Sequence, residues 1–250
     1  MKPSVFLACA VAVVAIAGCN SKQGNAATSA APAKIEQVAP PKGGDWTQVV
    51  NPTPAGGFVM GNPNAKVKLI EYGSLTCPHC KAFDDEGVPH LLDYVKSGQV
   101  SWEFRNYVRD AFDLTASLIA RCNGAKGFFP LTRAFYKDQA TWVGKIQATP
   151  QDQLQKMQDL PPNTQFVELA KVAGFPDWAA ARGVPQAKSQ QCLSNEKSVD
   201  QLVQMTSDVT NQYPEFQGTP TFILNGAMVP ETATWDKLEP ALKKALGERG

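Results

Sequence analysis

The sequence has few cysteines and only two histidines, no long run of like charges, and no apolar stretch of transmembrane length. Its 24 basic and 23 acidic residues leave a formal net charge of +1. Proteins that bind nucleic acids or anionic membranes electrostatically gather basic residues in patches. The charge pattern therefore gives no support for a nucleic-acid partner. With 250 residues, the chain can form one large domain, or one domain that carries an insertion.

The N-terminus has the pattern of an export signal. Lys2 precedes a run of small and apolar residues from 5 to 17, shorter than the roughly 20 residues that span a bilayer. The run ends in Gly18-Cys19 after Ile-Ala, which resembles a bacterial lipobox. That resemblance implies a lipoprotein signal peptide over residues 1–18 and a lipid on Cys19, on the periplasmic side of the envelope. An ordinary signal peptide that ends near a cysteine is the alternative.

The next segment is poor in large apolar residues. Residues 20–44 consist mainly of Ala, Ser, Gln, Pro, Gly and Lys. Such a segment cannot bury enough surface to offset the entropy lost on ordering. We therefore expect a flexible tether over residues 19–56, which would hold an ordered domain away from the anchor.

A strand, a helix and a strand follow in that order. Apolar stretches at residues 58–60 and 67–72 predict strands, and residues 100–108 alternate as a further strand. Between the last two, an apolar stripe predicts a helix that ends near Gly98, and Pro89 should kink or break it. This βαβ order predicts two parallel strands with a right-handed crossover.

The following hundred residues have helical patterns, and strand patterns then return. We expect helices at 114–122, 131–142, 151–160, 166–173, 178–182 and 199–209, with breaks at Pro and Gly pairs such as Phe129-Pro130. Asn225-Gly226 predicts a tight hairpin turn between apolar runs. An amphipathic helix is expected over residues 234–246. The helical stretch at 111–211 therefore forms an insertion between strands.

The motif "LTCPHCK" at residues 75–81 carries the chemistry. Pro78 is favoured at the first position of a helix, which places Cys77 at the N-terminus of that helix. Free N–H groups there stabilise an anion, and the neighbouring His79 adds a donor or a positive charge. Both effects lower the pKa of the Cys77 thiol. Cys80, inside the first turn, should be the less ionised and more buried partner.

A metal site and a structural disulfide are the two other roles open to this pair. If Cys19 is lipidated, the mature chain has the four cysteines Cys77, Cys80, Cys122 and Cys192, and export places them where disulfides persist. A zinc site would need ligands beyond two histidines, and there is no second CxxC motif. A structural disulfide between Cys77 and Cys80 would close too short a loop to be needed. The pattern favours a redox pair, with no metal and no cofactor.

Together, the "CPHC" motif after a strand, the helical insertion and the later "GTPTFILNG" resemble the DsbA-like thiol-disulfide oxidoreductases of the thioredoxin superfamily. The resemblance implies an α/β thioredoxin-like fold in two parts, residues 57–110 and 212–250. The inserted helical domain, residues 111–211, then lies between the βαβ unit and the C-terminal β-hairpin and helix. It implies that Cys77 is the nucleophile and that Cys80 resolves the mixed disulfide.

The same resemblance assigns roles to further residues. Pro220 matches the cis-proline of the family, and Thr219 before it would meet the substrate backbone. Oxidases commonly have valine at the position of Thr219, whereas isomerase-type relatives have threonine. Glu71 matches a buried acid under the active site and would relay a proton to Cys80, with a surface-facing glutamate as the alternative. Cys122 and Cys192 match a second, structural disulfide of some members, with two buried free thiols as the alternative.

The function expected from these features is the introduction of disulfide bonds into exported proteins through Cys77 and Cys80. Such an oxidase needs a membrane-embedded redox partner that reoxidises it, and the tether has no heptad pattern that would dimerise the chain. We therefore expect a monomer. A disulfide isomerase or reductase is one alternative. A lipoprotein that binds copper or one client through its two thiols, without catalysis, is the other.

Overall fold

The structure is a computed structural model that describes residues 34–41 and 44–248. These residues belong to one compact unit, 32–250, so the helical insertion packs together with the sheet. The expected signal peptide and the expected lipidation site at Cys19 lie outside the described residues. Within the described ranges, no helix has both the length and the apolar character needed to cross a membrane.

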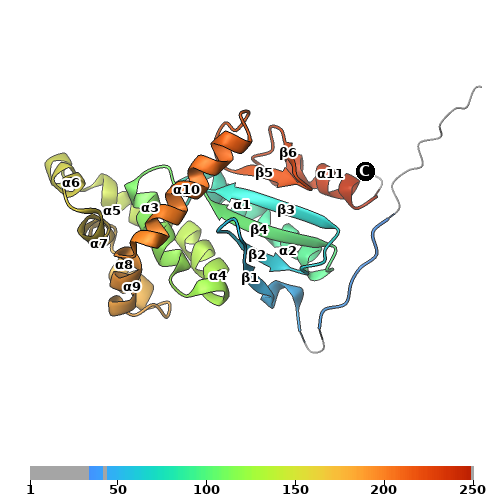
Figure 1. The fold of residues 1–250 in the computed structure, drawn as a ribbon, viewed down its shortest axis with the longest axis horizontal. Coiled ribbons are helices and arrows are strands. Elements are labelled where there is room, and N and C mark those ends of the chain that lie inside the picture. The colour runs from blue at the N-terminus through green and yellow to red at the C-terminus, as the bar shows by residue number, and fades with distance from the viewer. Residues whose placement is uncertain (1–33, 42–43, 249–250) are drawn as a thin grey trace, which may run out of the picture. The chain divides into compact units, whose positions relative to one another are not determined.

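A six-stranded mixed sheet forms the centre of this unit (Figure 1). The strands are β1 (Val50–Pro52), β2 (Phe58–Gly61), β3 (Val67–Gly73), β4 (Val100–Asn106), β5 (Thr221–Leu224) and β6 (Ala227–Val229). Their order in the sheet is β1-β2-β4-β3-β5-β6. Only β3 and β4 run parallel, and the other four pairings are antiparallel. Strand β3 is therefore central, with partners on both sides.

The predicted βαβ unit is confirmed. Two helices, α1 (Pro78–Glu86) and α2 (Val88–Lys96), connect β3 to β4. The helix is interrupted at Gly87, and Pro89 then lies in the first turn of α2, where a missing N–H costs nothing. The expected break in the helix is thus present, but it lies at Gly87, two residues before Pro89.

The expected tether over residues 19–56 is wrong for its last part. Trp46, in a short 3₁₀ helix (Trp46–Gln48), is buried, and its indole N–H donates to the Val38 carbonyl at 2.7 Å. Strand β1 then pairs with β2 at the sheet edge. The Ile35 N–H donates to the Leu246 carbonyl at 2.9 Å. Burial of one indole and edge pairing offset the entropy that the polar composition alone would leave uncompensated.

Helices alone make up the insertion. They are α3 (Ala111–Arg121), α4 (Gly124–Lys137), α5 (Gln139–Gln147), α6 (Gln151–Gln158), α7 (Pro162–Ala173), α8 (Phe175–Ala180), α9 (Gln186–Leu193) and α10 (Glu196–Gln212). The predicted break at Phe129-Pro130 is wrong, because α4 continues through Pro130. Phe128, Phe129 and Leu131 around it are buried, and this packing outweighs the lost hydrogen bond of an exposed proline. The predicted segments also omitted α9.

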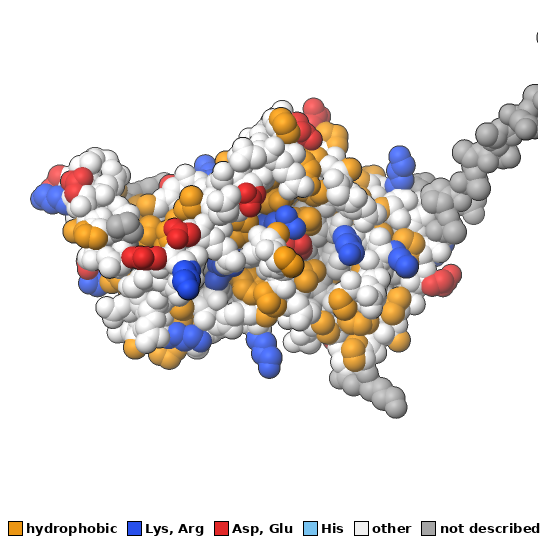
Figure 2. Space-filling view, in the orientation of Figure 1, with side chains coloured by type: hydrophobic (Ala, Val, Ile, Leu, Met, Phe, Trp, Pro, Cys, Tyr) orange, Lys and Arg blue, Asp and Glu red, His pale blue; other side chains and the backbone are white. Residues whose placement is uncertain are grey.

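Aromatic side chains join the insertion to the sheet. The Phe129 ring of α4 lies 4.8 Å from that of Trp102 in β4, and Phe128 lies 5.7 Å from Phe104. A fully buried phenylalanine contributes about 1.5–3 kcal/mol. After the hairpin, α11 (Trp235–Ala245) ends the described fold. The predicted α/β fold with a helical insertion between β4 and the C-terminal hairpin is confirmed. Figure 2 shows acidic and basic side chains interspersed on one face, with no large patch of either sign.

Candidate active site

The motif lies where β3 passes into α1. Gly73 ends the strand, and a Cβ there would lie 2.5 Å from the Phe104 ring, so the absence of a side chain lets this ring pack against the backbone. Cys77 is the N-cap residue of α1 and Pro78 occupies the first turn, as the sequence predicts. The N–H of Cys77 donates to the Ser74 carbonyl at 3.2 Å, which closes the loop between strand and helix.

Electrostatics favour the thiolate of Cys77. A hydrogen bond from the Cys80 thiol is the largest cause, and it lowers the pKa of Cys77 to about 5 against the opposing effect of burial. The Thr219 side chain and the backbone N–H groups of Cys80 and His79 act in the same direction. These N–H groups belong to the first turn of α1, where they have no partner within the helix. At neutral pH the Cys77 thiolate therefore dominates.

Cys80 has the opposite character. It is fully buried, and burial raises the pKa of its thiol well above the ordinary value. The hydrogen bond with Cys77 and the charges of Cys77 and Glu71 raise it further. Its Sγ accepts a hydrogen bond from the Ser74 N–H at 3.5 Å. The two cysteines thus differ strongly in acidity, and both thiols are free.

Glu71 lies in β3, and its side chain is buried rather than exposed to solvent. Burial is the main cause that raises its pKa well above the usual range, followed by the charge of Asp84. The Trp102 indole N–H donates to its Oε2 at 3.1 Å. Asp84 in α1 is also buried, and burial raises its pKa to about 6 although Arg133 lies 3.4 Å away. Both carboxyls therefore hold a proton to higher pH than exposed carboxyls do, and the charge of Glu71 acts on Cys80.

Pro220 and Thr219 approach the pair from a distant part of the sequence. The Thr219–Pro220 peptide bond is cis, the form that the resemblance implies. In the protonated state the Cys77 thiol donates to the Thr219 carbonyl at 3.1 Å. Beside this contact is a cleft of about 360 Å³. Its lining includes Cys77, His79, Tyr107, Arg109, Gln217 and Thr219.

Tyr107 and Arg109 are lining residues that the sequence analysis missed. They follow the end of β4, which runs parallel to β3. Because β3 leads into the CxxC loop, the carboxyl ends of these two strands meet at one edge of the sheet. Ligands of open α/β sheets bind at this edge. The predicted βαβ unit therefore contained the signal that could have found both residues.

The two cysteines of the insertion form a disulfide with each other, as the resemblance implies. Cys122 caps the C-terminus of α3 and is bonded to Cys192 in α9, with a Cα–Cα distance of 5.8 Å. Their pairing leaves Cys77 and Cys80 as the free cysteines of the described residues. The disulfide therefore links two helices of the insertion.

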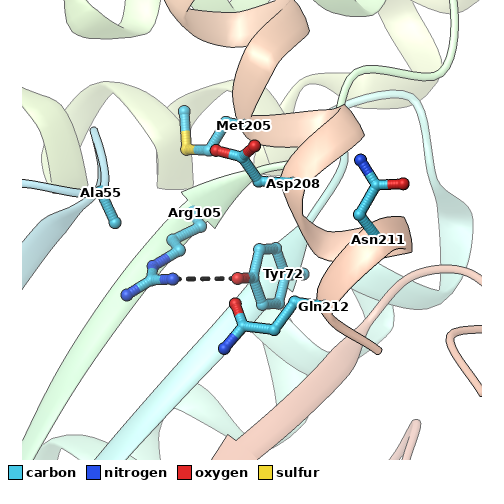
Figure 3. A pocket seen from close by; sticks show the side chains of 7 residues that line it. All are labelled: Ala55, Tyr72, Arg105, Met205, Asp208, Asn211 and Gln212. Atoms are coloured by element: carbon cyan, nitrogen blue, oxygen red, sulfur yellow. Dashed lines mark hydrogen bonds between the residues drawn. The ribbon is translucent and has the colours of Figure 1, made fainter. Parts of the chain in front are cut away.

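A second cavity, of about 400 Å³, lies over the sheet beside α10 (Figure 3). Arg105 of β4 and Tyr72 of β3 meet there, and the guanidinium donates to the phenol oxygen at 2.9 Å. Arg105 also forms an ion pair with Glu103 at 2.7 Å. The hydrogen bonds of these groups are satisfied within the fold, which is typical of a structural network.

Comparisons with known proteins agree with this geometry. A family model described as thioredoxin matches residues 53–244. A protein-disulfide isomerase of Novosphingobium aromaticivorans is 36% identical in sequence, with a TM-score of 0.72, covering 76% of this chain and 97% of its own. The structure of Wolbachia pipientis alpha-DsbA1, 21% identical, covers 78% of this chain and 93% of its own with a TM-score of 0.62, and it shows a common fold.

A Rickettsia felis protein with the provisional name protein-disulfide oxidoreductase is 28% identical over 194 residues, or 77% of this chain. The match covers 61% of that relative, so the chain spans about three fifths of its length. The fold and the CxxC site define a thioredoxin-like protein with an inserted helical segment. The chain belongs to the thioredoxin family and has the DsbA-like form of its fold.

Proposed function

We propose that this chain is a thiol-disulfide oxidoreductase that introduces disulfide bonds into exported proteins through Cys77 and Cys80. The main support is the difference in acidity between the two thiols. The pKa of Cys77 is lowered to about 5 and that of Cys80 is raised. A stabilised thiolate favours the reduced form of the pair, so the oxidised pair is a strong oxidant.

The reaction begins from the oxidised pair. A substrate thiolate attacks Sγ of Cys77, and the Cys77–Cys80 bond breaks with its electron pair on Cys80. The substrate is then joined to Cys77 in a mixed disulfide. A second substrate thiolate attacks the substrate sulfur of that bond, and Cys77 leaves as a thiolate, which its low pKa favours. The substrate loses two electrons, Cys80 keeps one proton, and the other proton passes to solvent.

Glu71 is the proposed source of the proton for Cys80. When the first bond breaks, Cys80 leaves as a thiolate whose raised pKa makes that form costly. The Glu71 carboxyl is buried nearby and holds a proton to higher pH than an exposed glutamate. The charge of Asp84 contributes to that shift. Proton donation by a positioned acid lowers the barrier for this departure.

The surroundings of the enzyme follow from the N-terminal motif and from the chemistry. A lipid on Cys19 would hold the domain at the periplasmic side of the envelope, where substrates with reduced cysteines emerge. Each turnover leaves the pair reduced, so a membrane-embedded partner must accept two electrons. The enzyme acts as a monomer in this proposal, because disulfide donation requires one redox pair.

Disulfide isomerisation or reduction is the second candidate. Thr219 favours it, since isomerase-type relatives have threonine before the cis-proline. The name of the Novosphingobium aromaticivorans relative, a protein-disulfide isomerase, favours it as well. A copper-binding role has less support, because the Thr219 carbonyl lies 3.1 Å from Sγ of Cys77 and already contacts the sulfur that would bind the metal.

Two assays with one multi-disulfide substrate separate these candidates. The oxidised protein is given the fully reduced substrate, and the reduced protein is given a scrambled form in a glutathione buffer. We expect rapid oxidation of the reduced substrate and little refolding of the scrambled substrate. Thr219→Val should leave the oxidation in place. Efficient refolding of the scrambled substrate that Thr219→Val abolishes would assign isomerisation instead. The absence of activity in both assays would contradict an enzymatic function.

A further inference from the structure

A buried carboxyl from the helical insertion holds the active-site loop. Asp113 of α3 is fully buried and accepts three hydrogen bonds. Its Oδ2 accepts from the Ser74 hydroxyl at 2.6 Å and from the Arg109 N–H at 3.0 Å. Its Oδ1 accepts from the Leu75 N–H at 2.9 Å. All three donors are neutral, and Asp113 is in none of the ion pairs found among the described residues.

A capping role explains only one of these bonds. Asp110 is the N-cap residue of α3 and accepts from the Asp113 N–H at 2.8 Å. The hydrogen bond from the Arg109 N–H likewise stabilises the N-terminus of α3. The other two bonds leave α3 and reach the loop between β3 and Cys77. A surface carboxylate would cap the helix equally well, and burial raises the pKa of Asp113 to about 7. The buried position therefore has a cost that capping does not require.

The loop residue that Asp113 holds contacts both cysteines. The Ser74 N–H donates to Sγ of Cys80 at 3.5 Å, and the Ser74 carbonyl accepts from the Cys77 N–H at 3.2 Å. Tyr136 of α4 donates to that same carbonyl at 3.2 Å. Ser74 thus fixes the relative position of the two sulfurs, and Asp113 fixes Ser74.

A second side chain of the insertion supports the same loop. The Gln139 amide of α5 donates to the carbonyls of Leu75 and Cys77, at 2.7 and 3.1 Å. Asp113 and Gln139 come from different helices and satisfy opposite groups of the loop, N–H and C=O. Side chains of the insertion therefore form hydrogen bonds both with donor groups of the loop and with its carbonyl oxygens.

We propose that Asp113 is a positioning residue for the redox pair: through Ser74 it keeps Cys80 aligned with Cys77 and thereby sets the reduction potential. This inference rests on the proposed redox function. Stabilisation of the Cys77 thiolate depends first on the hydrogen bond from Cys80. A looser Ser74 weakens that bond, destabilises the reduced form and makes the pair less oxidising.

The test is the substitution Asp113→Asn in the mature protein. The measured quantity is the equilibrium constant for reduction of the Cys77–Cys80 disulfide by glutathione. An asparagine has one acceptor, so its NH₂ group must face the N–H of Leu75 or of Arg109. We expect the constant to fall about tenfold, equivalent to about 30 mV toward a more reducing potential. The measurement is made at about pH 8, where the wild-type carboxyl is ionised.

The direction of the change separates positioning from charge. Removal of a nearby negative charge would by itself stabilise the Cys77 thiolate and make the pair more oxidising. Asp110→Asn is the matched control, because it removes one charge at the same helix end, keeps a side-chain oxygen that can cap α3, and involves no hydrogen bond to the loop. We expect it to leave the melting temperature nearly unchanged and the equilibrium constant within about twofold.

Ser74→Ala provides a second variant, which removes only the hydroxyl that Asp113 holds. We expect a fall of about threefold in the same direction, and no further fall when it is added to Asp113→Asn. A Ser74→Ala constant within twofold of wild type overturns the proposal, whether or not Asp113→Asn folds. A more oxidising Asp113→Asn variant also overturns it. If the wild-type pair itself has the potential of a structural disulfide, the redox function fails instead.

Discussion

The acidity of Cys77 should depend chiefly on the thiol of Cys80, and the substitution Cys80→Ala tests this. The hydrogen bond from Cys80 is the largest of the causes that lower the pKa of Cys77 to about 5. A hydrogen bond to a charged group contributes about 1.5–3 kcal/mol, and one pKa unit corresponds to about 1.36 kcal/mol. Its loss should therefore raise the pKa of Cys77 by about one to two units, because the backbone N–H donors remain.

The assay follows alkylation of Cys77 against pH, read by mass spectrometry of the peptide that contains it. At about pH 5.5 the ionised fraction should fall from about three quarters in the wild type to about one quarter or less. Cys80→Ser is the matched control, since its hydroxyl can still donate and should keep the pKa below that of Cys80→Ala. The reasoning is refuted if both variants keep a pKa within about half a unit of the wild type.

Further predictions concern stability and proton transfer. Cys122→Ala with Cys192→Ala opens a loop with a sequence separation of 70, so the free energy of unfolding should fall by roughly 4 kcal/mol in denaturant titrations. The glutathione equilibrium of the Cys77–Cys80 pair should not change, and a changed equilibrium would contradict a purely structural role for this disulfide. Glu71→Gln should slow reduction of the oxidised pair at least about tenfold, while Glu71→Asp retains the acid; equal rates for all three proteins would remove Glu71 from the mechanism. The pKa of Asp84 is raised from 3.8 to about 6 in the folded state, so its contribution favours folding at low pH and is lost as the pH rises through 6. Relative to Asp84→Asn, the wild type should lose up to about 3 kcal/mol of stability between about pH 4 and pH 7. A stability difference that is constant or rises with pH would contradict this assignment.

Local patterns were sufficient for every strand except β1 and for the position of the Cys77–Cys80 pair. The parallel strands β3 and β4 and the break before Pro89 follow from alternation, from apolar runs and from proline geometry. Strand β1 was not predicted, because it has only three residues, two of them exposed, and ends in a proline. Such a segment forms a strand only because it pairs with β2, and this pairing depends on the tertiary structure rather than on the local sequence.

The residues that support the active-site loop were hidden for a related reason. Asp110 and Asp113 form an ordinary helix-start pattern, which explains both residues without reference to the redox pair. Gln139 lies more than sixty residues from Leu75 and Cys77, whose carbonyls it meets. Contacts between the insertion and the loop depend on how the helices pack, and no local periodicity records that packing. Burial of Asp113 is the observation that distinguishes it from Asp110.

The reduction potential of the Cys77–Cys80 pair tests the central claim most directly. The mature protein is equilibrated with glutathione buffers, and the fractions of oxidised and reduced pair are quantified by alkylation and mass spectrometry. A Cys77 thiolate stabilised to a pKa of about 5 predicts a potential more positive than about −200 mV, in the range of disulfide donors. A potential below about −300 mV, which is typical of structural disulfides, would contradict the account.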